Sequence, residues 1–440
     1  MFDGSYLTPK KRIIIPVYGS VDVTQVRDII NLPEFQRTGH IYQLGLNHLI
    51  FRGATHTRFV HMVGTLKQCR EYTRPLVMKG MISKDDARHI EAAGLLHDVG
   101  HGPFSHAVEK VLEAYGSKYK DHKEHTLALL KERFSHTLSR LGFDPSRVVQ
   151  IVAKKEPLSA LISHKTLGAD KVSYVRLDQH YVGYPSSALA IGDIPENLLF
   201  VEGTIGVDER MHHNVQLIQR AYFDMYTQVY LRKQDCAAVR VLERAVQQSI
   251  EDGLSNADDV WKMTDSELLV SLKSNKGRWN RAVDNLFFNR GMHCVAVSLR
   301  VRGHESKELK RGKSISILPM KSPSEFFDWY SDPKRVIKAE SAVSQMIGAS
   351  LDDVIITCTG NPYSLALEDV QLFDPYANKL STLFERYPDH ARSLKEQSQF
   401  ATACRVMVRP EFREKAYDCA QEISDLLHEV VGEYSKNKEE

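Results

Sequence analysis

The chain of 440 residues lacks any long hydrophobic segment. No apolar run approaches the ~18 residues that a membrane-spanning helix requires. The N-terminal segment MFDGSYLTPKKR also lacks the hydrophobic core of a secretory signal peptide. These absences argue against a membrane-spanning or secreted protein, and we expect a cytoplasmic protein with no membrane partner.

Cysteine is scarce and scattered. The six cysteines never form a CxxC pair and stand far apart, at positions 69, 236, 294, 358, 404 and 419. Such spacing indicates neither a zinc ribbon nor a disulfide framework. We therefore expect these residues to be thiols in the core.

An excess of charge of either sign is missing as well. With 58 basic and 56 acidic residues the net charge is +2, so the chain has no overall signature of nucleic-acid binding. One segment departs from this balance, and its basic residues are Arg300, Arg302, Lys307, Lys310, Arg311 and Lys313. A solvated hairpin loop is the simpler interpretation of residues 300–313, and contact with single-stranded nucleic acid is the alternative. The RGKS within it is not a phosphate loop, because Lys307 stands where that motif needs a glycine.

Hydrophobic periodicity predicts a mainly α protein with two parts. A hydrophobic content of 42% over this length is enough for a large core and a second, smaller domain. After short extended segments at residues 13–23, helical patterns dominate up to about Gly291. Beyond that point strands are predicted at residues 293–301 and 354–358, alternating with helices. We predict a helical bundle in residues 1–290 and a smaller α+β lobe in residues 291–440.

The run HDVGHGPFSH, from His97 to His106, is the most informative part of the chain. Imidazole nitrogen and carboxylate oxygen suit divalent ions such as Zn, Mn and Fe, and an adjacent His-Asp pair supplies two such ligands. Further ligands are available upstream at His61 and downstream at Asp170. Burying these groups together without a metal or ion partners would carry a large desolvation cost. The sequence therefore predicts a metal site formed by His61, His97, Asp98 and Asp170.

The spacing of these four ligands resembles the H…HD…D quartet of the HD superfamily of metal-dependent phosphohydrolases. The flanking words PEFQR (33–37), YQLG (42–45), TRFVH (57–61) and ADKVSY (169–174) are similar to those of its deoxynucleoside triphosphate triphosphohydrolase branch. The likeness extends over roughly residues 10–235, with its core motifs within 30–185. It implies that residues 1–290 form an HD phosphohydrolase domain.

The resemblance also implies an activity and a cofactor. The implied reaction hydrolyses dNTPs to a deoxynucleoside and inorganic triphosphate by attack of a metal-activated water. One divalent transition metal per subunit is implied, with Mn, Fe, Zn, Co and Ni not distinguished by the sequence. Mg could accompany the substrate triphosphate. The branch commonly forms homo-oligomers, and we expect one here.

Cations and proton donors are expected around the substrate phosphates, because negative charge develops on oxygen during phosphoryl transfer. Arg58 lies one helical turn before His61, and Lys171 directly follows Asp170, so both are placed to reach phosphate oxygens. His101 and His106 follow the ligand pair and could donate a proton or hold the phosphate.

Further roles are implied by the resemblance alone. Positions matching His101, His106 and His122 line the phosphate site in the resembled branch, where the match to His106 is linked to proton transfer and Glu109 is placed to assist it. The usual glutamate after His122 is Lys123 here, and His125 is a rival for the role of His122.

Recognition of the sugar is implied in the same way. Positions matching Gln43, Tyr174 and Asp178 contact the deoxyribose in the resembled enzymes. Taken alone, Gln43 would be interpreted as a surface residue and Tyr174 as a core aromatic residue. Arg232 stands where the branch often has a histidine that faces the phosphates.

One departure from the pattern of the resembled branch concerns activation by a nucleotide. In the vertebrate enzymes of this branch, a guanine nucleotide activates assembly through charged residues that flank the FQR segment. Asn31 and Gly39 occupy those positions here, and Ile14 replaces a further asparagine. We therefore do not expect obligatory activation by guanine nucleotide.

Two other classes of function remain open at this point. The same metal site could serve a nuclease or phosphodiesterase that acts on single-stranded nucleic acid through residues 300–313. An esterase of cyclic dinucleotides is disfavoured, because His101 stands where that family has lysine. The third class is a binding protein with an inactive site, against which the intact ligand quartet argues.

Overall fold

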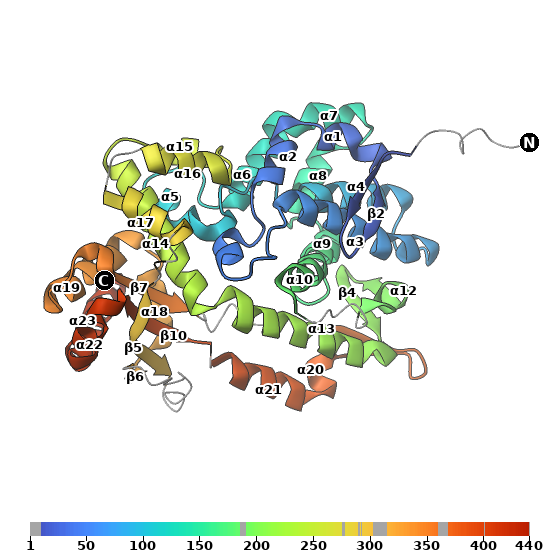
Figure 1. Ribbon diagram of the computed structural model, residues 1–440. Helices are drawn as coiled ribbons and strands as arrows, with labels where there is room; N and C mark the ends of the chain where they lie inside the picture. Colours follow the sequence, from blue (N-terminus) through green and yellow to red (C-terminus); the bar gives the residue numbers. More distant parts are fainter. Residues whose placement is uncertain are drawn as a thin grey trace, which may run out of the picture.

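The computed structural model describes residues 10–184, 191–274, 278–288, 291, 293–301, 315–359, 368–399 and 401–439. Most of these residues are helical, and a smaller part with strands lies beside the main bundle (Figure 1). In the described part of the chain, no helix is both long and apolar enough to cross a bilayer. The predicted mainly α fold is confirmed.

The described chain begins with a two-stranded ribbon, as the extended pattern predicted. Strands β1 (Arg12–Ile15) and β2 (Gly19–Asp22) pair antiparallel. Two short helices follow, α1 (Arg27–Ile30) and α2 (Pro33–Arg37). The apolar side of this segment packs into the main core, where Phe35 is fully buried.

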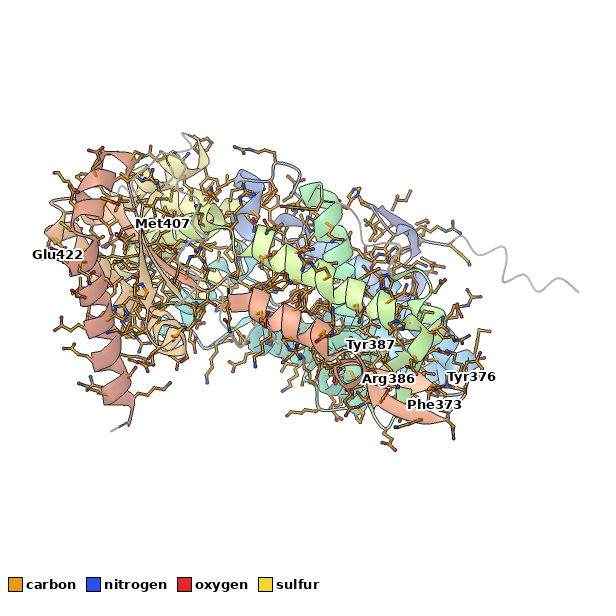
Figure 2. The ribbon with its side chains drawn as sticks, turned by 90° about the horizontal axis from the view of Figure 1, so that it is seen from below. Phe373, Tyr376, Arg386, Tyr387, Met407 and Glu422 are labelled. Carbon is orange, nitrogen blue, oxygen red and sulfur yellow. The ribbon has the colours of Figure 1, made fainter. Side chains whose placement is uncertain are left out.

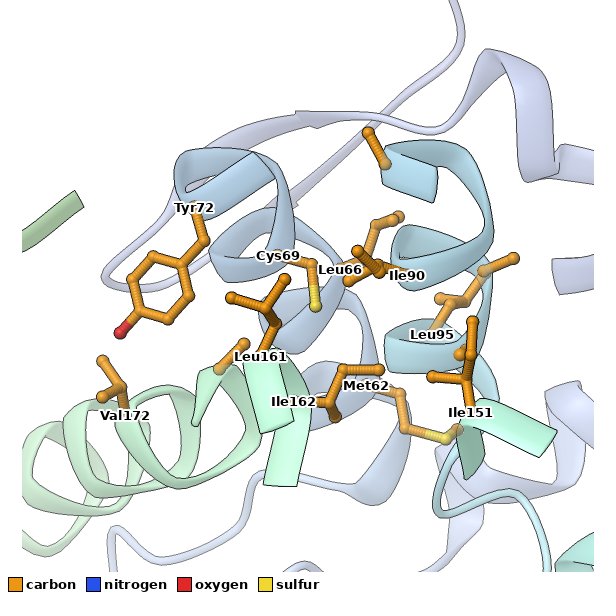
Figure 3. Packing of buried hydrophobic residues seen from close by; sticks show 14 of the residues in the cluster. Met62, Leu66, Cys69, Tyr72, Ile90, Leu95, Ile151, Leu161, Ile162 and Val172 are labelled. Atoms are coloured by element: carbon orange, nitrogen blue, oxygen red, sulfur yellow. The ribbon is translucent and has the colours of Figure 1, made fainter. Parts of the chain in front are cut away.

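Three helices form the centre of the bundle: α3 (Arg58–Met78), α4 (Lys84–Leu96) and α10 (Ala169–Val182). They cross closely because glycines lie at the contacts. A Cβ atom on Gly94 of α4 would come 2.5 Å from Sγ of Cys69 on α3, and one on Gly64 of α3 would come 2.9 Å from the Leu177 side chain on α10. Figure 3 shows apolar side chains of these helices interlocking around Cys69.

Polar contacts fix the start of α4 against its neighbour α8 (Pro145–Val152). Ser83 and Asp86 form a reciprocal capping box at the N-terminus of α4. His89 of α4 accepts a hydrogen bond from the backbone N–H of Asp144 through Nε2, at 2.9 Å. His89 therefore links two helices of the core.

A second group of helices packs beside the central bundle. Helix α13 (His212–Met225) continues through a π-helical turn (Tyr226–Tyr230) to α14 (Lys233–Glu251). Helices α15 (Ala257–Val260), α16 (Asp265–Ser274) and α17 (Arg278–Phe287) follow. Helices α14 to α17, together with α5 (Glu109–Ala114), enclose a second apolar core around the fully buried Trp261.

The C-terminal lobe is built on a four-stranded sheet in the order β6-β5-β10-β7. Its strands are β5 (Cys294–Val301), β6 (Ser316–Met320), β7 (Val354–Thr359) and β10 (Ala403–Val408). Strands β5 and β7 confirm the two predicted strands. One face packs against the core that contains α14, through Val295, Ile355 and Met407. The other face is covered by α18 (Pro323–Tyr330), α19 (Pro333–Met346), α22 (Arg413–Asp418) and α23 (Ala420–Glu439).

A segment of the C-terminal half returns to the helical bundle. Strand β4 (Thr204–Asp208) pairs antiparallel with β3 (Leu198–Val201) and parallel with β8 (Gln371–Asp374), which pairs with β9 (Lys379–Thr382). Helices α20 (Leu383–Arg386) and α21 (Pro388–Gln399) come next in the chain, and α21 packs against α13. In Figure 2, Tyr376 and Arg386 lie at the opposite end of the molecule from Met407 and Glu422. Strand β8 and helix α21, which lie after the predicted boundary at residue 290, thus pack against elements that lie before it.

Candidate metal centre and active site

The four predicted metal ligands come from the three central helices. His61 lies on α3, His97 directly follows α4, and Asp170 lies in the first turn of α10. Asp98 follows His97. The close helix crossings at Gly64 and Gly94 therefore bring ligands that are far apart in the sequence to one point.

The ligand atoms converge closely. Nε2 of His61 and Nε2 of His97 are 3.3 Å apart, and each lies 3.2 Å from Oδ1 of Asp170. Asp98 completes the group, with its two carboxylate oxygens 3.6 Å from His61 Nε2 and 3.5 Å from His97 Nε2. Ligand atoms at about 2.1 Å from one ion are roughly 3.0–3.4 Å apart, so this set has the dimensions of a coordination shell.

The surroundings of these ligands also suit a cation. His97 Nδ1 lies 2.8 Å from the carbonyl oxygen of Gly94, which fixes the ring and leaves Nε2 directed at the other ligands. Burial alone would lower the pKa of His97, but the carboxylates of Asp98 and Asp170 raise it to about 9. Positive charge is thus favoured at this position. His61, His97 and Asp170 form a group that could hold a divalent metal ion, and the Asp98 carboxylate lies close enough to both imidazoles to join them.

Arg58 is engaged with the protein itself. Its Nη1 donates to Oδ2 of Asp98 at 2.5 Å, Nε donates to Oγ of Ser105 at 2.9 Å, and Nη2 reaches the backbone oxygen of Gln43 at 3.3 Å. The side chain is buried. Each of the three nitrogens of the Arg58 guanidinium already donates a hydrogen bond within the protein, which limits the predicted contact with phosphates. The contact with Asp98 orients that carboxylate.

A second group of titratable residues lies beside the metal ligands: His101, His106, Glu109 and His122. Oε1 of Glu109 lies 2.9 Å from Nδ1 of His122, 3.2 Å from Nδ1 of His106 and 3.5 Å from Nδ1 of His101. His101 stacks on His122, and its Nε2 is 3.5 Å from Asp98 Oδ2. One carboxylate thus joins three imidazoles next to the metal centre.

Electrostatics give these groups different properties. Burial, with the charge of Arg58 and of His122, lowers the pKa of His101 to about 3, which favours the neutral ring. Burial would raise the pKa of Glu109, but its histidine partners, with His106 the strongest, lower it below the ordinary value. His106 is the accessible member, with 64% of its side chain exposed. Only this imidazole can readily meet a group that enters from solvent.

The two candidate histidines, His122 and His125, differ in their positions. His122 belongs to the cluster, at the start of α6 (His122–Leu129), whereas His125 Nδ1 lies 2.7 Å from the carbonyl oxygen of Gly100 and its ring stacks on Tyr119. Gly100 packs directly on α6, since a Cβ atom there would come 2.6 Å from the carbonyl oxygen of His122. The glycine of HDVGH thus permits the approach of His122.

Two residues that fix the active-site loops have no individual signal in the sequence. Asp265 accepts hydrogen bonds from the backbone N–H of Tyr42 at 2.8 Å and of Phe104 at 2.5 Å. Burial raises its pKa to about 7, against these hydrogen bonds. Arg37 donates to the backbone oxygens of His101 and Met263. Both side chains link the segment HDVGHGPFSH to parts of the chain that are distant in sequence.

Of the predicted sugar-binding residues, Tyr174 lies near a candidate metal ligand. The ring of Tyr174 is 6.3 Å from that of His61. Asp178 is buried, with Oδ1 2.8 Å from Nε2 of His56 and Oδ2 accepting from the Tyr230 hydroxyl at 2.5 Å. Oε1 of Gln43 is buried without a hydrogen-bond partner. An acceptor of this kind is costly to leave unpaired, and it fits a ligand that donates a hydroxyl.

The two remaining predicted cations differ in setting. The ammonium of Lys171 lies 3.4 Å from the ring centre of Tyr222, and burial lowers its pKa to about 8. Arg232 is exposed at the start of α14, with its guanidinium 5.1 Å from the Phe51 ring centre. The described contacts therefore place Lys171 over the Tyr222 ring, and Arg232 beside Phe51. Of the basic residues predicted to form a solvated loop at 300–313, Arg300 is instead buried in β5, and the others lie outside the described residues.

Comparison with known proteins agrees with this geometry. Residues 58–171, which include all four candidate ligands, match the HD domain family. The chain is also similar in fold to a phosphohydrolase from Bacteroides thetaiotaomicron, with a TM-score of 0.71, 21% sequence identity, and coverage of 91% of this chain and 100% of that one.

Curated relatives match over longer stretches of sequence than the family model does. The uncharacterized protein YwfO of Bacillus subtilis is 32% identical over 261 residues, which cover 56% of this chain and 58% of the relative. A deoxynucleoside triphosphate triphosphohydrolase SAMHD1 homolog of Dictyostelium discoideum is 24% identical over 283 residues, covering 60% and 53%. The match thus spans little more than half the length of these relatives.

Proposed function

We propose that the chain is a metal-dependent phosphohydrolase that converts dNTPs to a deoxynucleoside and inorganic triphosphate. The observation that carries the proposal is the convergence of His61, His97, Asp98 and Asp170 beside the cluster of three histidines and Glu109. A relative with this activity in its name supports the choice of substrate.

His61, His97, Asp98 and Asp170 would bind the metal. When bound, a divalent ion makes water more acidic and polarises a phosphoryl oxygen. In the proposed reaction, water attacks the α-phosphorus, the bond from that phosphorus to O5′ breaks, and O5′ receives a proton. We assign the proton to His106, whose imidazole is exposed and contacts Glu109.

The sugar would lie between Gln43 and Tyr174. Gln43 offers its unpaired Oε1 to a sugar hydroxyl. Both oxygens of Asp178 are already hydrogen-bonded to His56 and Tyr230, so Asp178 would act by fixing these two side chains. A site that hydrogen-bonds a hydroxyl rejects analogues that lack it, because the buried acceptor is then unpaired.

The experiment is incubation of the purified protein with each dNTP, each NTP and single-stranded DNA, under Mn, Mg, Fe and Co. Chromatography would separate the products. We expect inorganic triphosphate and deoxynucleoside in equal amounts. Degradation of single-stranded DNA without release of triphosphate would instead identify a nuclease and refute the proposal.

A further inference from the structure

Asp265 joins two active-site segments that are far apart in the sequence. It is the first residue of α16 and is buried. Its Oδ2 accepts a hydrogen bond from the backbone N–H of Tyr42 at 2.8 Å, and its Oδ1 accepts one from the backbone N–H of Phe104 at 2.5 Å. One carboxylate thus connects the segment that carries Gln43 to the segment that carries His106.

The two segments also contact each other directly. The Ser105 hydroxyl donates to the backbone oxygen of Tyr42 at 2.7 Å. Gly45 packs on the backbone of Phe104, because a Cβ atom at position 45 would come 2.8 Å from the Phe104 carbonyl oxygen. The Ser105 hydroxyl also accepts a hydrogen bond from Nε of Arg58 at 2.9 Å. A displacement of either segment would therefore disturb the other.

The backbone just before His106 has a conformation that needs such support. Phe104 and Ser105 both have positive φ angles, of 54° and 59°. Residues other than glycine rarely adopt this left-handed region, so the surrounding contacts must hold the two residues there. The bond from the Phe104 N–H to Asp265 is one such contact. Loss of the Asp265 carboxylate would allow the backbone that leads to His106 to relax.

Helix α16 provides a firm base for this carboxylate. Leu268 and Leu272 lie on the same helix and are buried in the core around Trp261. Asp265 therefore holds its two partners from a separate, well-packed part of the molecule. A rigid support of this kind is what an active site needs to keep its reacting groups in one geometry.

We propose that Asp265 is a positioning residue that sets the distance between Gln43, the acceptor for the sugar hydroxyl, and His106, the proton donor. The statement rests on the proposed function, which assigns those two roles. Asp265 acts through the backbone beside each group and does not touch the substrate. It thereby makes recognition of the sugar and protonation of O5′ depend on the same anchor.

The test compares substrates in the variant Asp265→Asn, which keeps the size of the side chain. The amide nitrogen would face a backbone N–H, so one of the two hydrogen bonds is lost. We expect kcat to fall by about tenfold to hundredfold, because small misplacements of reacting groups have effects of this size. The preference for a dNTP over the 2′,3′-dideoxynucleotide, as a ratio of kcat/KM values, should also fall, by about threefold or more.

This ratio separates positioning from a general effect on folding. A partly unfolded variant contains less active enzyme, but its ratio of kcat/KM for two substrates is unchanged. Ser105→Ala removes the direct hydrogen bond to Tyr42 and should lower the ratio too, so it replaces Asp265→Asn if that variant does not fold. The control Asp259→Asn has the same change of net charge at an exposed position of α15, and it should match the wild type in kcat and in the ratio.

Hydrogen exchange measured by mass spectrometry tests the anchor without turnover. Residues 42–47 and 102–107 should both exchange faster in Asp265→Asn than in the wild type and in Asp259→Asn. Faster exchange in one segment only, or in neither, would overturn the inference.

The outcomes separate this inference from the proposed function. If the wild type hydrolyses no dNTP, the proposed function fails, and the exchange result decides whether Asp265 fixes both segments. If the wild type is active, an unchanged ratio in Asp265→Asn would overturn the inference and leave the proposed function standing.

Discussion

Oε1 of Glu109 lies 2.9 Å from Nδ1 of His122, so the carboxylate fixes the ring that faces Asp98. Changing Glu109 to Gln keeps the size of the side chain and removes its charge. The three imidazoles then lose their shared anionic partner, and we expect kcat to fall by about 10²-fold or more, because proton transfer needs a positioned histidine. Steady-state kinetics with a dNTP would measure it.

The neighbouring Glu113 provides the control for this prediction. It lies on the same short helix α5 and is exposed. Glu113→Gln should leave kcat unchanged. Equal kcat in Glu109→Gln and the wild type would show that the carboxylate contributes only to structure.

Loss of one metal ligand should lower the metal content. We expect Asp98→Ala to bind far less metal than the wild type, because water must replace a carboxylate and Arg58 loses its partner in a buried setting. Elemental analysis after gel filtration measures this. Asp389→Asn, at an exposed position of α21, should retain the wild-type content. A full equivalent of metal in Asp98→Ala would exclude Asp98 as a ligand.

The orphaned oxygen of Gln43 predicts the choice among sugars. A 2′,3′-dideoxynucleotide should be a poorer substrate than the matching dNTP by roughly 1–3 kcal/mol in kcat/KM, since a buried acceptor is left unpaired. In Gln43→Ala this difference should shrink, because the acceptor is gone. Equal discrimination in the variant and the wild type would place the sugar elsewhere.

Asp235 should make stability depend on pH. Burial raises its pKa from the ordinary 3.8 to about 8 in the folded state. The folded protein therefore holds this proton more tightly than the unfolded chain, and its contribution to stability is full below about pH 4 and is lost as pH rises to about 8. The free energy of unfolding, from urea titrations at several pH values, should decline over that interval.

The variant Asp235→Asn cannot ionise and should decline less. At pH 8.5 we expect it to be more stable than the wild type by roughly 1–3 kcal/mol, because no charge is buried. Asp252→Asn, at the exposed C-terminal end of the same helix, should follow the wild type. Parallel pH profiles for Asp235→Asn and the wild type would contradict burial as the cause.

The sequence predicted the metal ligands better than the residues that support them. The HD pair and its partners stand in recognisable words, whereas Asp265 reaches Phe104 across 161 positions and Tyr42 across 223. His56 likewise meets Asp178 only in the folded chain. A single aspartate or histidine carries no local pattern that reveals such a contact.

The same limit applies to the fold. Helices with repeated apolar spacing, such as α14, were predictable, as were β5 and β7 in the lobe. The short strands β3 and β4 were not predicted, because they lie within the stretch up to Gly291 whose overall pattern was interpreted as helical. The parallel pairing of β4 with β8 joins segments that no local pattern connects.

That parallel pairing also sets an order of events during synthesis. Strand β4 leaves the ribosome long before β8, so one of its edges stays open while the intervening lobe is translated. An open strand edge can pair with another chain. Nascent chains halted after the helical bundle should therefore associate more readily than chains that have passed Thr382, where β9 ends and the small sheet is complete.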